Sequence, residues 1–260
     1  MATEVMIKGR VSRSLPQMDI DGGREGEPAR LSRYGEVGVF SPIRKTHSLI
    51  DEGSYFVANS GSATGILSSP AVGWVATTPC CVIYNGDSAG ATAKRLYLDF
   101  ILLNTTVVGS AASGLLRVEA AVYLDIGNRY SSAGTEITAN IYNPNMDGPA
   151  RASVARVWFG AITATAASGS VRPISPLRVC RPTVSGTVAD VVGETKLFNF
   201  GGVEGTLNGS VTIANANFIT IPMPGIVIGP NQSALLYVWQ NVGGTPVAAT
   251  YAPEIAFWER

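Results

Sequence analysis

Apolar and polar residues alternate in several short stretches of this chain, and the clearest of them is LLRVEAAVYL at residues 115–124. Every second residue from Leu116 to Leu124 is apolar, whereas Arg117 and Glu119 fall on the opposite face. Successive side chains of a β-strand point to opposite sides, so this period places one apolar face in a core. The stretch therefore predicts a half-buried strand.

A second stretch, KRLYLDFILL at residues 94–103, has a different balance between its two faces. One face is wholly apolar and comprises Leu96, Leu98, Phe100 and Leu102. The opposite face is only partly polar, and it comprises Arg95, Tyr97, Asp99, Ile101 and Leu103. A strand that is apolar on both sides is typical of one covered on both sides. We therefore expect both faces of this strand to be covered.

Further runs rich in β-branched and aromatic residues predict strands at 72–77, 80–85, 154–164, 195–200, 210–213, 217–221, 233–240 and from 247 almost to Arg260. Turn sequences such as YNGDSAG, GNRYSSAG, NPNMDGP and GPNQ separate them. The sequence therefore predicts an all-β domain over residues 47–260, folded as an antiparallel β-sandwich. The number and length of the strands favour a jelly roll.

Residues 1–46 have a different composition from the rest of the chain. They hold eight of its 19 Lys and Arg residues and six of its 19 Asp and Glu residues. Pro16, Pro28, Pro42 and the Gly22-Gly23 pair interrupt every run within them. Such a segment disfavours a long helix or a buried strand, and it holds too little apolar surface to fold alone. We interpret it as an extended N-terminal arm.

The overall composition narrows the possible functions. Charged residues make up 15% of the chain, against about 25% in an average soluble domain, so the sandwich surface is unusually neutral and typical of one that a second subunit covers. A formal net charge of zero disfavours binding to nucleic acid or an anionic membrane by bulk charge. The odd cysteine count (Cys80, Cys81 and Cys180) does not fit a disulfide framework and indicates a reducing compartment. The sequence shows neither an apolar secretory leader nor a run long enough to span a membrane.

Motifs for catalysis and metal binding are weak throughout. His47, the one histidine, is not accompanied by a Gly-x-Ser-x-Gly motif, and we interpret it as an exposed linker residue. Three cysteines and one histidine, scattered along the chain, do not supply the four converging ligands of a zinc site. NPNMDG at residues 143–148 copies the start of a calcium loop, but Val154 occupies the twelfth position, so a turn in which Asn143 and Asp147 bond their own backbone fits better. We expect no metal and no other cofactor.

One pair of acids has catalytic potential. If residues 94–103 and 115–124 form a hairpin about Gly109, Asp99 falls opposite Glu119, with Arg117 diagonally adjacent. Two carboxylates on one sheet face are the machinery of a glycoside hydrolase. An ion pair of Arg117 with either acid is the more ordinary arrangement, so a carboxylate-dependent hydrolase is the less favoured alternative.

Four segments carry a resemblance to a class of viral proteins. They are SYFVANSGSATGIL, TTPCCVIYNGDSAGATAKRLYLDFILL, DIGNRYSSAGTEITANIYNPNMDGPA and the terminal PEIAFWER. In general style, residues 54–260 resemble jelly-roll virion structural proteins of tailed bacteriophages, of the capsid decoration (cement) type. The resemblance implies homotrimers seated on the capsid lattice, with terminal arms that reach across neighbouring capsomers.

These observations favour a structural role. A neutral, apolar sandwich suits closed self-association, and an arm of mixed charge suits a protein surface better than a polyanion. We therefore expect a non-enzymatic virion protein, assembled in the host cytoplasm, that forms a homotrimer and anchors to the major capsid protein or another virion protein, without contacts to membrane or direct contacts to nucleic acid. The expected partner-binding residues are Arg24, Arg30, Arg33, Arg44 and Lys45, which would pair with carboxylates, and Tyr34, Val39 and Phe40, which would be apolar anchors.

A receptor- or glycan-binding module of a tail or fibre is the main alternative. Such a module would use exposed aromatic residues in the loops at one end of the sandwich. The four tryptophans, Trp74, Trp158, Trp239 and Trp258, are spread through predicted strands, which is more typical of core or subunit contacts.

Overall fold

The computed structural model describes residues 45–61, 65–68, 73–90, 92–108, 110–111, 116–146, 152–184, 192–201, 218–242 and 246–260. Contacts divide the chain into two units, Met1–Lys45 and Thr46–Arg260, and the fold below is that of the second unit. Seven of the eight predicted partner-binding residues, Arg24 to Arg44, lie outside the described residues. The eighth, Lys45, is the first residue of a short helix.

One sheet has eight strands among the described residues. Its main path runs, in spatial order, through β12 (Phe218–Met223), β11 (Thr195–Phe200), β4 (Leu96–Val107), β16 (Thr250–Glu259), β1 (Tyr55–Asn59) and β8 (Ile141–Tyr142). The short strand β13 (Ile226–Ile228) pairs with β4, and β2 (Ile66–Leu67) pairs with β16. The sheet thus combines strands from both ends of the second unit.

The other large sheet has six strands in the described part of the chain. Their spatial order is β10 (Arg172–Val184), β6 (Leu116–Ile126), β14 (Gln232–Val242), β3 (Cys81–Asn85), β9 (Ala155–Ala164) and β7 (Tyr130–Glu136). A separate pair joins β5 (Ser110–Ala111) to β15 (Pro246–Val247), and a 3-10 turn, η1 (Thr138–Asn140), precedes β8.

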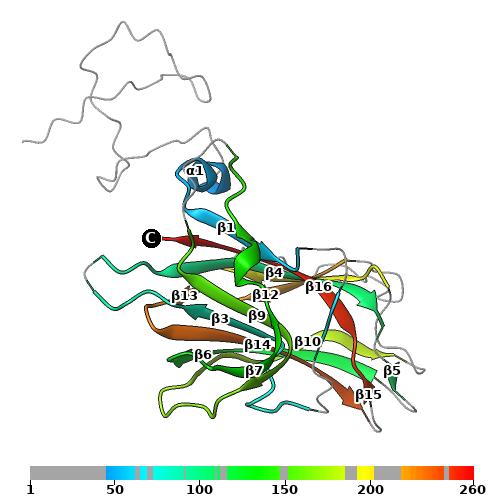
Figure 1. Ribbon diagram of the computed structural model, residues 1–260. Coiled ribbons are helices and arrows are strands. Elements are labelled where there is room, and N and C mark those ends of the chain that lie inside the picture. The colour runs from blue at the N-terminus through cyan, green and yellow to red at the C-terminus, as the bar shows by residue number, and fades with distance from the viewer. Residues whose placement is uncertain are drawn as a thin grey trace, which may run out of the picture. The chain divides into compact units, whose positions relative to one another are not determined.

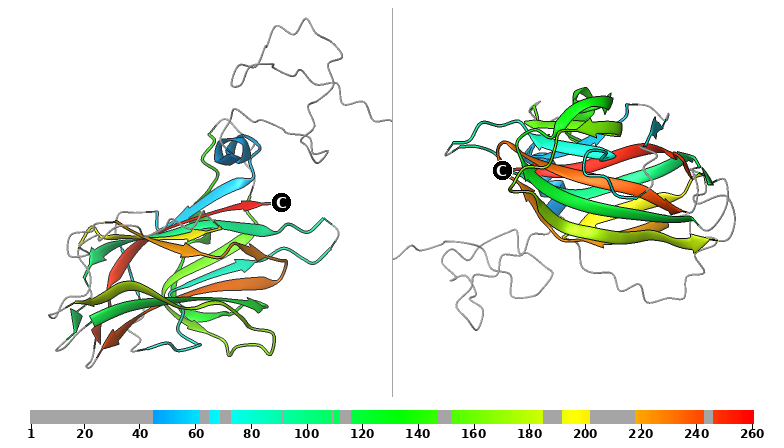
Figure 2. Two further views of the ribbon diagram at one scale, coloured as in Figure 1. Left: turned by 180° about the vertical axis from the view of Figure 1, so that it is seen from behind. Right: turned by 90° about the horizontal axis from the view of Figure 1, so that it is seen from below.

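The two large sheets lie in stacked layers (Figures 1 and 2), and one apolar core fills the space between them. Ile101 and Phe257 enter this core from the eight-stranded sheet, and Val122 and Leu236 enter it from the six-stranded sheet. This arrangement confirms the predicted all-β sandwich. Among the described strand pairs, β11 and β12 run parallel and the others are antiparallel, whereas the jelly-roll connectivity stays a prediction.

β4 contains a bulge that the alternation of its sequence does not reveal. Leu98 pairs with Phe257 of β16, and Phe100 pairs with the preceding residue, Ala256. Asp99 is therefore an extra residue with no counterpart on β16. A bulge of this kind shifts the two-residue period of the strand by one position.

The bulge decides which side chains of β4 enter the core. Leu98 points into the core before it, and Ile101 and Leu103 do so after it. Phe100 and Leu102 are turned to the other side of the sheet, where both are only partly buried. The prediction that these two residues share the face of Leu98 is therefore wrong, because it assumed an unbroken period.

β6 confirms the predicted apolar face but differs on the other face. Val118, Ala120 and Val122 lie in the central core, as the alternation predicted. On the opposite face, Ala121 and Tyr123 belong to a second apolar cluster on the far side of the six-stranded sheet. Both faces of β6 are therefore covered, which the charges in its sequence did not indicate.

The predicted hairpin between residues 94–103 and 115–124 is wrong. β4 pairs with β11, β16 and β13 in one sheet, whereas β6 pairs with β10 and β14 in the other. Asp99 and Glu119 consequently lie in different layers and do not form a catalytic pair. β4 and β6 pair instead with strands that are distant in sequence, so the predicted turn about Gly109 does not join them.

The remaining strands agree only in part with the predictions. Strands β3, β9, β11, β12, β14 and β16 lie where the sequence placed them. The predicted strand at 72–77 is wrong, since residues 73–79 form a loop with a turn bond from the Thr78 amide to the Val75 carbonyl (3.1 Å). β1, β7 and β10 were not predicted, because β10 is rich in proline and β7 lies within a turn-like sequence. The predicted strand at 210–213 lies outside the described residues.

A short helix, α1 (Lys45–Asp51), lies over β1 on the side of its sheet away from the core (Figure 1). Leu49 packs there against Tyr55 and Ala256. Lys45 and Thr46, which were predicted to belong to the extended arm, are its first two residues. His47 is exposed on this helix, which confirms its predicted exposure.

The three cysteines are free and buried. Burial raises the pKa of Cys80 and of Cys81 well above the usual range of a thiol, so both remain protonated at neutral pH. The thiol of Cys80 also donates to the Leu236 carbonyl at 3.3 Å. Inert, inaccessible thiols are the expected consequence.

We predict that the native protein does not react with a thiol-specific reagent such as dithionitrobenzoate over minutes at neutral pH. All three cysteines should react once guanidinium unfolds the chain, and that sample is the control. Absorbance of the released thiolate measures both reactions. Rapid labelling of the native protein would contradict the burial of these side chains.

Candidate functional site

The eight-stranded sheet presents a broad apolar surface on the side away from the core, and we call this side the outer face. The strand registers place side chains of six strands in common rows across it. Its larger apolar members are Val57, Tyr97, Phe100, Leu102, Leu197, Phe218, Val227 and Trp258. Phe218 and Val227 are 56% and 42% exposed, and the others are partly buried. The apolar cluster of helix α1 includes side chains of β1 and β16 and Phe100 of β4.

Two carboxylates, those of Asp99 and Glu254, lie within the apolar rows of the outer face. Asp99 sits at the bulge and accepts a hydrogen bond from the Tyr55 hydroxyl at 2.9 Å. Burial, the charges of Asp99 and Glu254, and this hydrogen bond raise the pKa of Tyr55, so its hydroxyl stays a donor. Among the described strands of the sheet, no outward-facing residue is lysine or arginine; Arg95 and Arg260 lie beyond the strand ends. The rows therefore combine apolar groups with negative charge.

β10, the edge strand of the six-stranded sheet, carries exposed residues of both kinds. Leu177 and Val179 are 53% and 49% exposed, and Arg172 and Arg178 are exposed as well. The register with β6 places Arg178 opposite Ala120, on the core side, and Val179 opposite Glu119, on the far side. Neither arginine forms an ion pair with any described residue, and Arg178 donates from Nε to the Ser175 hydroxyl at 3.0 Å.

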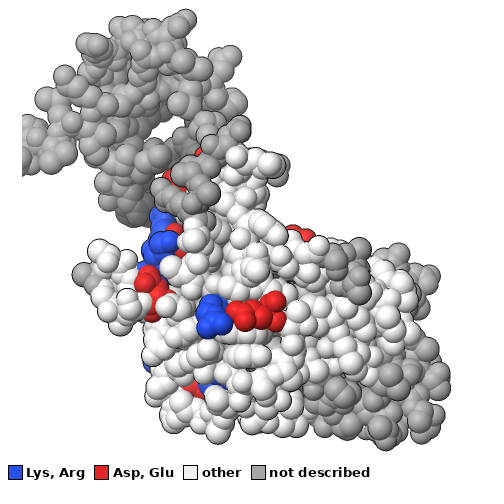
Figure 3. All heavy atoms as spheres, in the orientation of Figure 1, with Lys and Arg blue, Asp and Glu red and all other residues white. Residues whose placement is uncertain are grey.

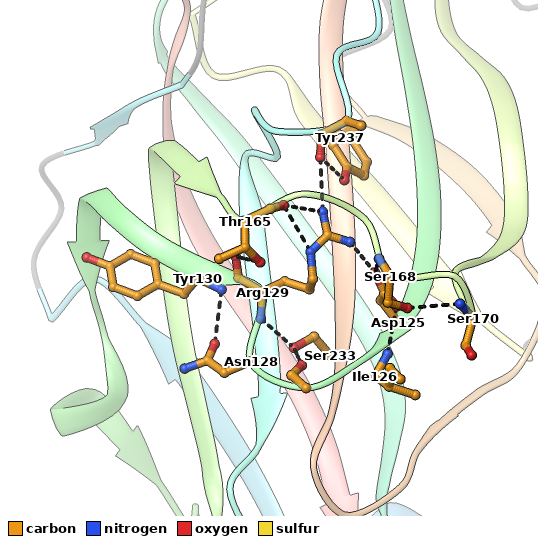
Figure 4. Close-up of polar contacts among 12 residues, drawn as sticks. Asp125, Ile126, Asn128, Arg129, Tyr130, Thr165, Ser168, Ser170, Ser233 and Tyr237 are labelled. Carbon is orange, nitrogen blue, oxygen red and sulfur yellow. Dashed lines mark hydrogen bonds and ion pairs between the residues drawn. The ribbon is translucent and has the colours of Figure 1, made fainter.

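A buried ion pair lies at one end of the six-stranded sheet, on its far side from the core (Figure 4). Arg129 pairs with Asp125, and both side chains are almost completely buried. The guanidinium also donates to the Thr165 carbonyl at 2.6 Å and to the Ala76 carbonyl at 3.3 Å. Ser168 donates from its amide to Asp125 at 3.0 Å and bonds it through its hydroxyl as well. These bonds fasten three separate loops together.

The clamped loops hold an exposed tryptophan in place. Tyr237 donates to the Ala76 carbonyl at 2.9 Å, and the Ala164 amide donates to the Thr77 carbonyl at 2.8 Å. Trp74 of the same loop stacks on Tyr123, with ring centroids 5.3 Å apart, and remains 43% exposed. Exposed aromatic rings with a rigid backing are typical of contact sites.

Two other ion pairs with buried members stabilise the fold. Lys196 and Glu194 form a fully buried pair at 2.8 Å, with the ammonium 5.3 Å from the Tyr251 ring centroid. Glu259 pairs with Lys94 at 2.9 Å and accepts the Val154 amide at the same distance. Such groups join strand ends to loops, because buried charges are stable only when paired and hydrogen-bonded.

The structure places the candidate catalytic and metal-binding residues apart from one another. Glu119 is buried and accepts a hydrogen bond from the Trp239 indole at 2.9 Å, in the other layer from Asp99. Asn143 accepts the Asn145 amide at 2.7 Å, which confirms that half of the predicted turn, whereas Asp147 lies outside the described residues. The described residues contain no group of three or more His, Cys, Asp or Glu placed to hold a metal ion.

Charge is unevenly distributed over the described surface. In the view of Figure 3 that surface is mostly uncharged, and charged side chains gather mainly along the side near the C-terminus. One further group lies in the middle of the view. Large neutral areas of this kind agree with the low charge content of the sequence.

Comparisons with known proteins add no assignment. No protein-family model matches the chain, and no curated protein or solved structure has significant similarity to it. In the described part of the chain, no helix is long and apolar enough to cross a membrane.

Sequence reasoning missed the ion pair and most of the outer face. Asp125 and Arg129 lie in DIGNR, whose composition is that of an exposed turn, and no local pattern reveals that Thr165 and Ala76 close over them. On the outer face, the bulge at Asp99 decides which β4 side chains point outward, and the alternation does not show this. Apolar residues on both sides of residues 94–103 were the available signal for an apolar outer face.

We predict that Asp125→Asn lowers the free energy of unfolding by about 3–5 kcal/mol, because Arg129 is then buried without a counter-charge. Burial raises the pKa of Asp125, but hydrogen bonds from Ser168, Ile126 and Arg129 outweigh it and keep the pKa below its usual value. The stability that Asp125 provides is therefore present above pH ~4 and lost as the pH falls further.

Urea unfolding at neutral and acidic pH measures both effects. The matched control is Glu136→Gln, which removes an exposed ion pair with Arg156 and should cost less than about 1 kcal/mol. Equal losses in the two variants would show that the Asp125–Arg129 pair is not a structural clamp.

Proposed function

We propose that this chain is a non-enzymatic virion structural protein, a capsid decoration protein that self-associates through its sandwich. The observation that carries this proposal is the outer face of the eight-stranded sheet, where partly buried Phe100, Leu102 and Leu197 adjoin the exposed Phe218. Contiguous apolar surface rimmed by polar groups is typical of protein–protein contact. Closed self-association covers such a surface once on each copy.

In this proposal the N-terminal arm binds the major capsid protein or another virion protein. Its mixture of arginine, glutamate and apolar residues suits an irregular protein surface, and a segment that orders on binding gains a large contact area. The contact residues are those named from the sequence: Arg24, Arg30, Arg33, Tyr34, Val39, Phe40, Arg44 and Lys45.

The roles of the buried acids also support a structural function. Asp125, Glu194 and Glu259 are each engaged in ion pairs that hold loops and strand ends. The one carboxylate pair that the sequence offered for hydrolysis, Asp99 and Glu119, is divided between the two layers. The geometry therefore gives the hydrolase alternative no support.

We predict that the full-length protein is an oligomer, with a trimer expected, in multi-angle light scattering. The double variant Arg30→Glu/Arg33→Glu should keep this mass and bind capsids of the parent virus at least about tenfold more weakly in co-sedimentation, since arm arginines then repel acidic partners. Arg95→Glu, an exposed reversal on the sandwich, is the control. A monomeric wild-type protein, or unchanged capsid binding by the arm variant, would contradict the proposal.

A receptor- or glycan-binding module is the second candidate, and the Trp74–Tyr123 stack is the observation that favours it. A flat, rigidly backed ring is a suitable platform for the apolar face of a sugar. On a glycan array the wild-type protein would then bind specific glycans, and Trp74→Ala would lose that binding. Tyr142→Ala, which alters an exposed aromatic residue elsewhere, should have no effect. An array without any bound glycan removes this candidate.

A further inference from the structure

Negative charge on the outer face is not balanced by any lysine or arginine that points outward from its described strands. Glu254 lies in a row between Asn59 of β1 and Leu102 of β4. Asp99 lies beside Phe100 at the bulge. Neither carboxylate forms an ion pair with another described residue. Because a carboxylate that is buried without a counter-charge costs free energy, a partner that covers these rows is favoured when it carries cations among apolar groups.

Residues 5–15 of the chain, which we call the basic segment, combine cations with apolar side chains. Their sequence, VMIKGRVSRSL, contains Lys8, Arg10 and Arg13 and no Asp or Glu. Alternate residues of an extended chain point to the same side, so the aliphatic residues at odd positions share one side with Arg13. They are Val5, Ile7, Val11 and Leu15. The segment therefore offers, in one strip, the apolar and positive groups that complement the outer face.

The basic segment is distinct from the residues proposed to bind the capsid, which begin at Arg24. Residues 16–44, 29 in all, connect it to the start of α1. A chain of that length can span at most about 100 Å, since each extended residue adds ~3.3–3.6 Å. This reach is enough for the basic segment of one copy to contact an adjacent copy, while the capsid contacts form elsewhere along the arm.

We propose that the basic segment of one copy binds the outer face of a second copy, so that its cations face Asp99 and Glu254 and its aliphatic side chains cover Leu102. This inference rests on the self-association in the proposed function and names the two surfaces that produce it. Because the two surfaces differ, the contact is heterologous, and it forms a closed ring when its rotation closes. Each copy then gives one basic segment and receives another.

Charge reversal in the full-length protein is the first test of this contact. Arg10→Glu/Arg13→Glu should weaken association by about tenfold or more, because it places like charges against the outer face. Glu254→Arg should have a similar effect from the other side of the contact. Arg30→Glu/Arg33→Glu, which also reverses two charges of the arm, is the matched control and should keep the wild-type mass. Light scattering over a dilution series measures the mass, and circular dichroism checks the fold.

A photo-cross-link distinguishes binding to a second copy from other occupants of the outer face. Benzoylphenylalanine replaces Val11 in the full-length protein, and isotopically light and heavy copies are mixed, dissociated and reassociated before irradiation. Mass spectrometry should find cross-linked peptides that join the basic segment to β4 or β16, including peptides that join a heavy chain to a light chain. The same probe in the Arg10→Glu/Arg13→Glu background is the control, and there these products should be lost.

Each outcome decides the proposal. Loss of association in both reversals, together with heavy-to-light cross-links on β4 or β16, supports the contact. Association that survives either reversal overturns it, and so do cross-links confined to single chains or to other strands. If Glu254→Arg does not fold, Glu254→Gln replaces it, and unchanged association of that variant overturns the contact.

The result is separable from the test of the proposed function. A wild-type oligomer that tolerates these reversals refutes the contact and leaves self-association in place. A wild-type monomer refutes both. Capsid binding is measured with Arg30→Glu/Arg33→Glu, which leaves the basic segment unchanged, so it does not enter this experiment.

Discussion

β4 carries apolar side chains on both of its faces, and a two-layer sandwich has only one interior. Because burial is worth about 25 cal/mol per Å² of apolar surface, each face of such a strand gains by being covered. The bulge at Asp99 divides the strand between them: Leu98, Ile101 and Leu103 fill the core, and Phe100 and Leu102 remain on the outer face. The bulge thus decides which β4 side chains join the outer face, whose other apolar members come from the neighbouring strands.

The two sheets differ in what covers their outward surfaces. The six-stranded sheet is covered near Tyr237 by loop 73–79 of its own chain, and the Asp125–Arg129 pair holds that loop down. On the eight-stranded sheet, the described cover is α1, whose cluster includes Tyr55, Ala256 and Phe100. A buried ion pair is stable only when its hydrogen bonds are nearly complete, and the loops of the six-stranded sheet supply these bonds. The outer face of the second sheet, in contrast, leaves Phe218 and Val227 exposed among the described residues.

Much of the fold could be predicted from the sequence because alternation and turn composition are local signals. They located β3, β9, β11 and β14 and predicted the sandwich. They failed where long-range pairing decides the structure. The proline-rich β10 and the turn-like β7 are strands because β6 and β9 offer them partners, and β4 and β6 separate because each finds better neighbours than the other. The apolar second face of β4 could be predicted, but not which of its residues point outward, because that depends on a one-residue bulge. The Arg129 clamp could not be predicted, because it depends on loops distant in sequence.

A net charge of zero gives no indication of how this surface is organised. It disfavours attraction of the whole protein to a polyanion by bulk charge, yet the described surface separates its charges: carboxylates lie among the apolar rows of the outer face, and the exposed Arg172 and Arg178 lie on β10. Apolar burial alone fixes no orientation between two copies, because it is not directional. Opposite charges placed within apolar patches add that direction, since every misaligned approach leaves a charge desolvated without a partner. A partner of the outer face therefore gains most when it places a positive group opposite Asp99 or Glu254.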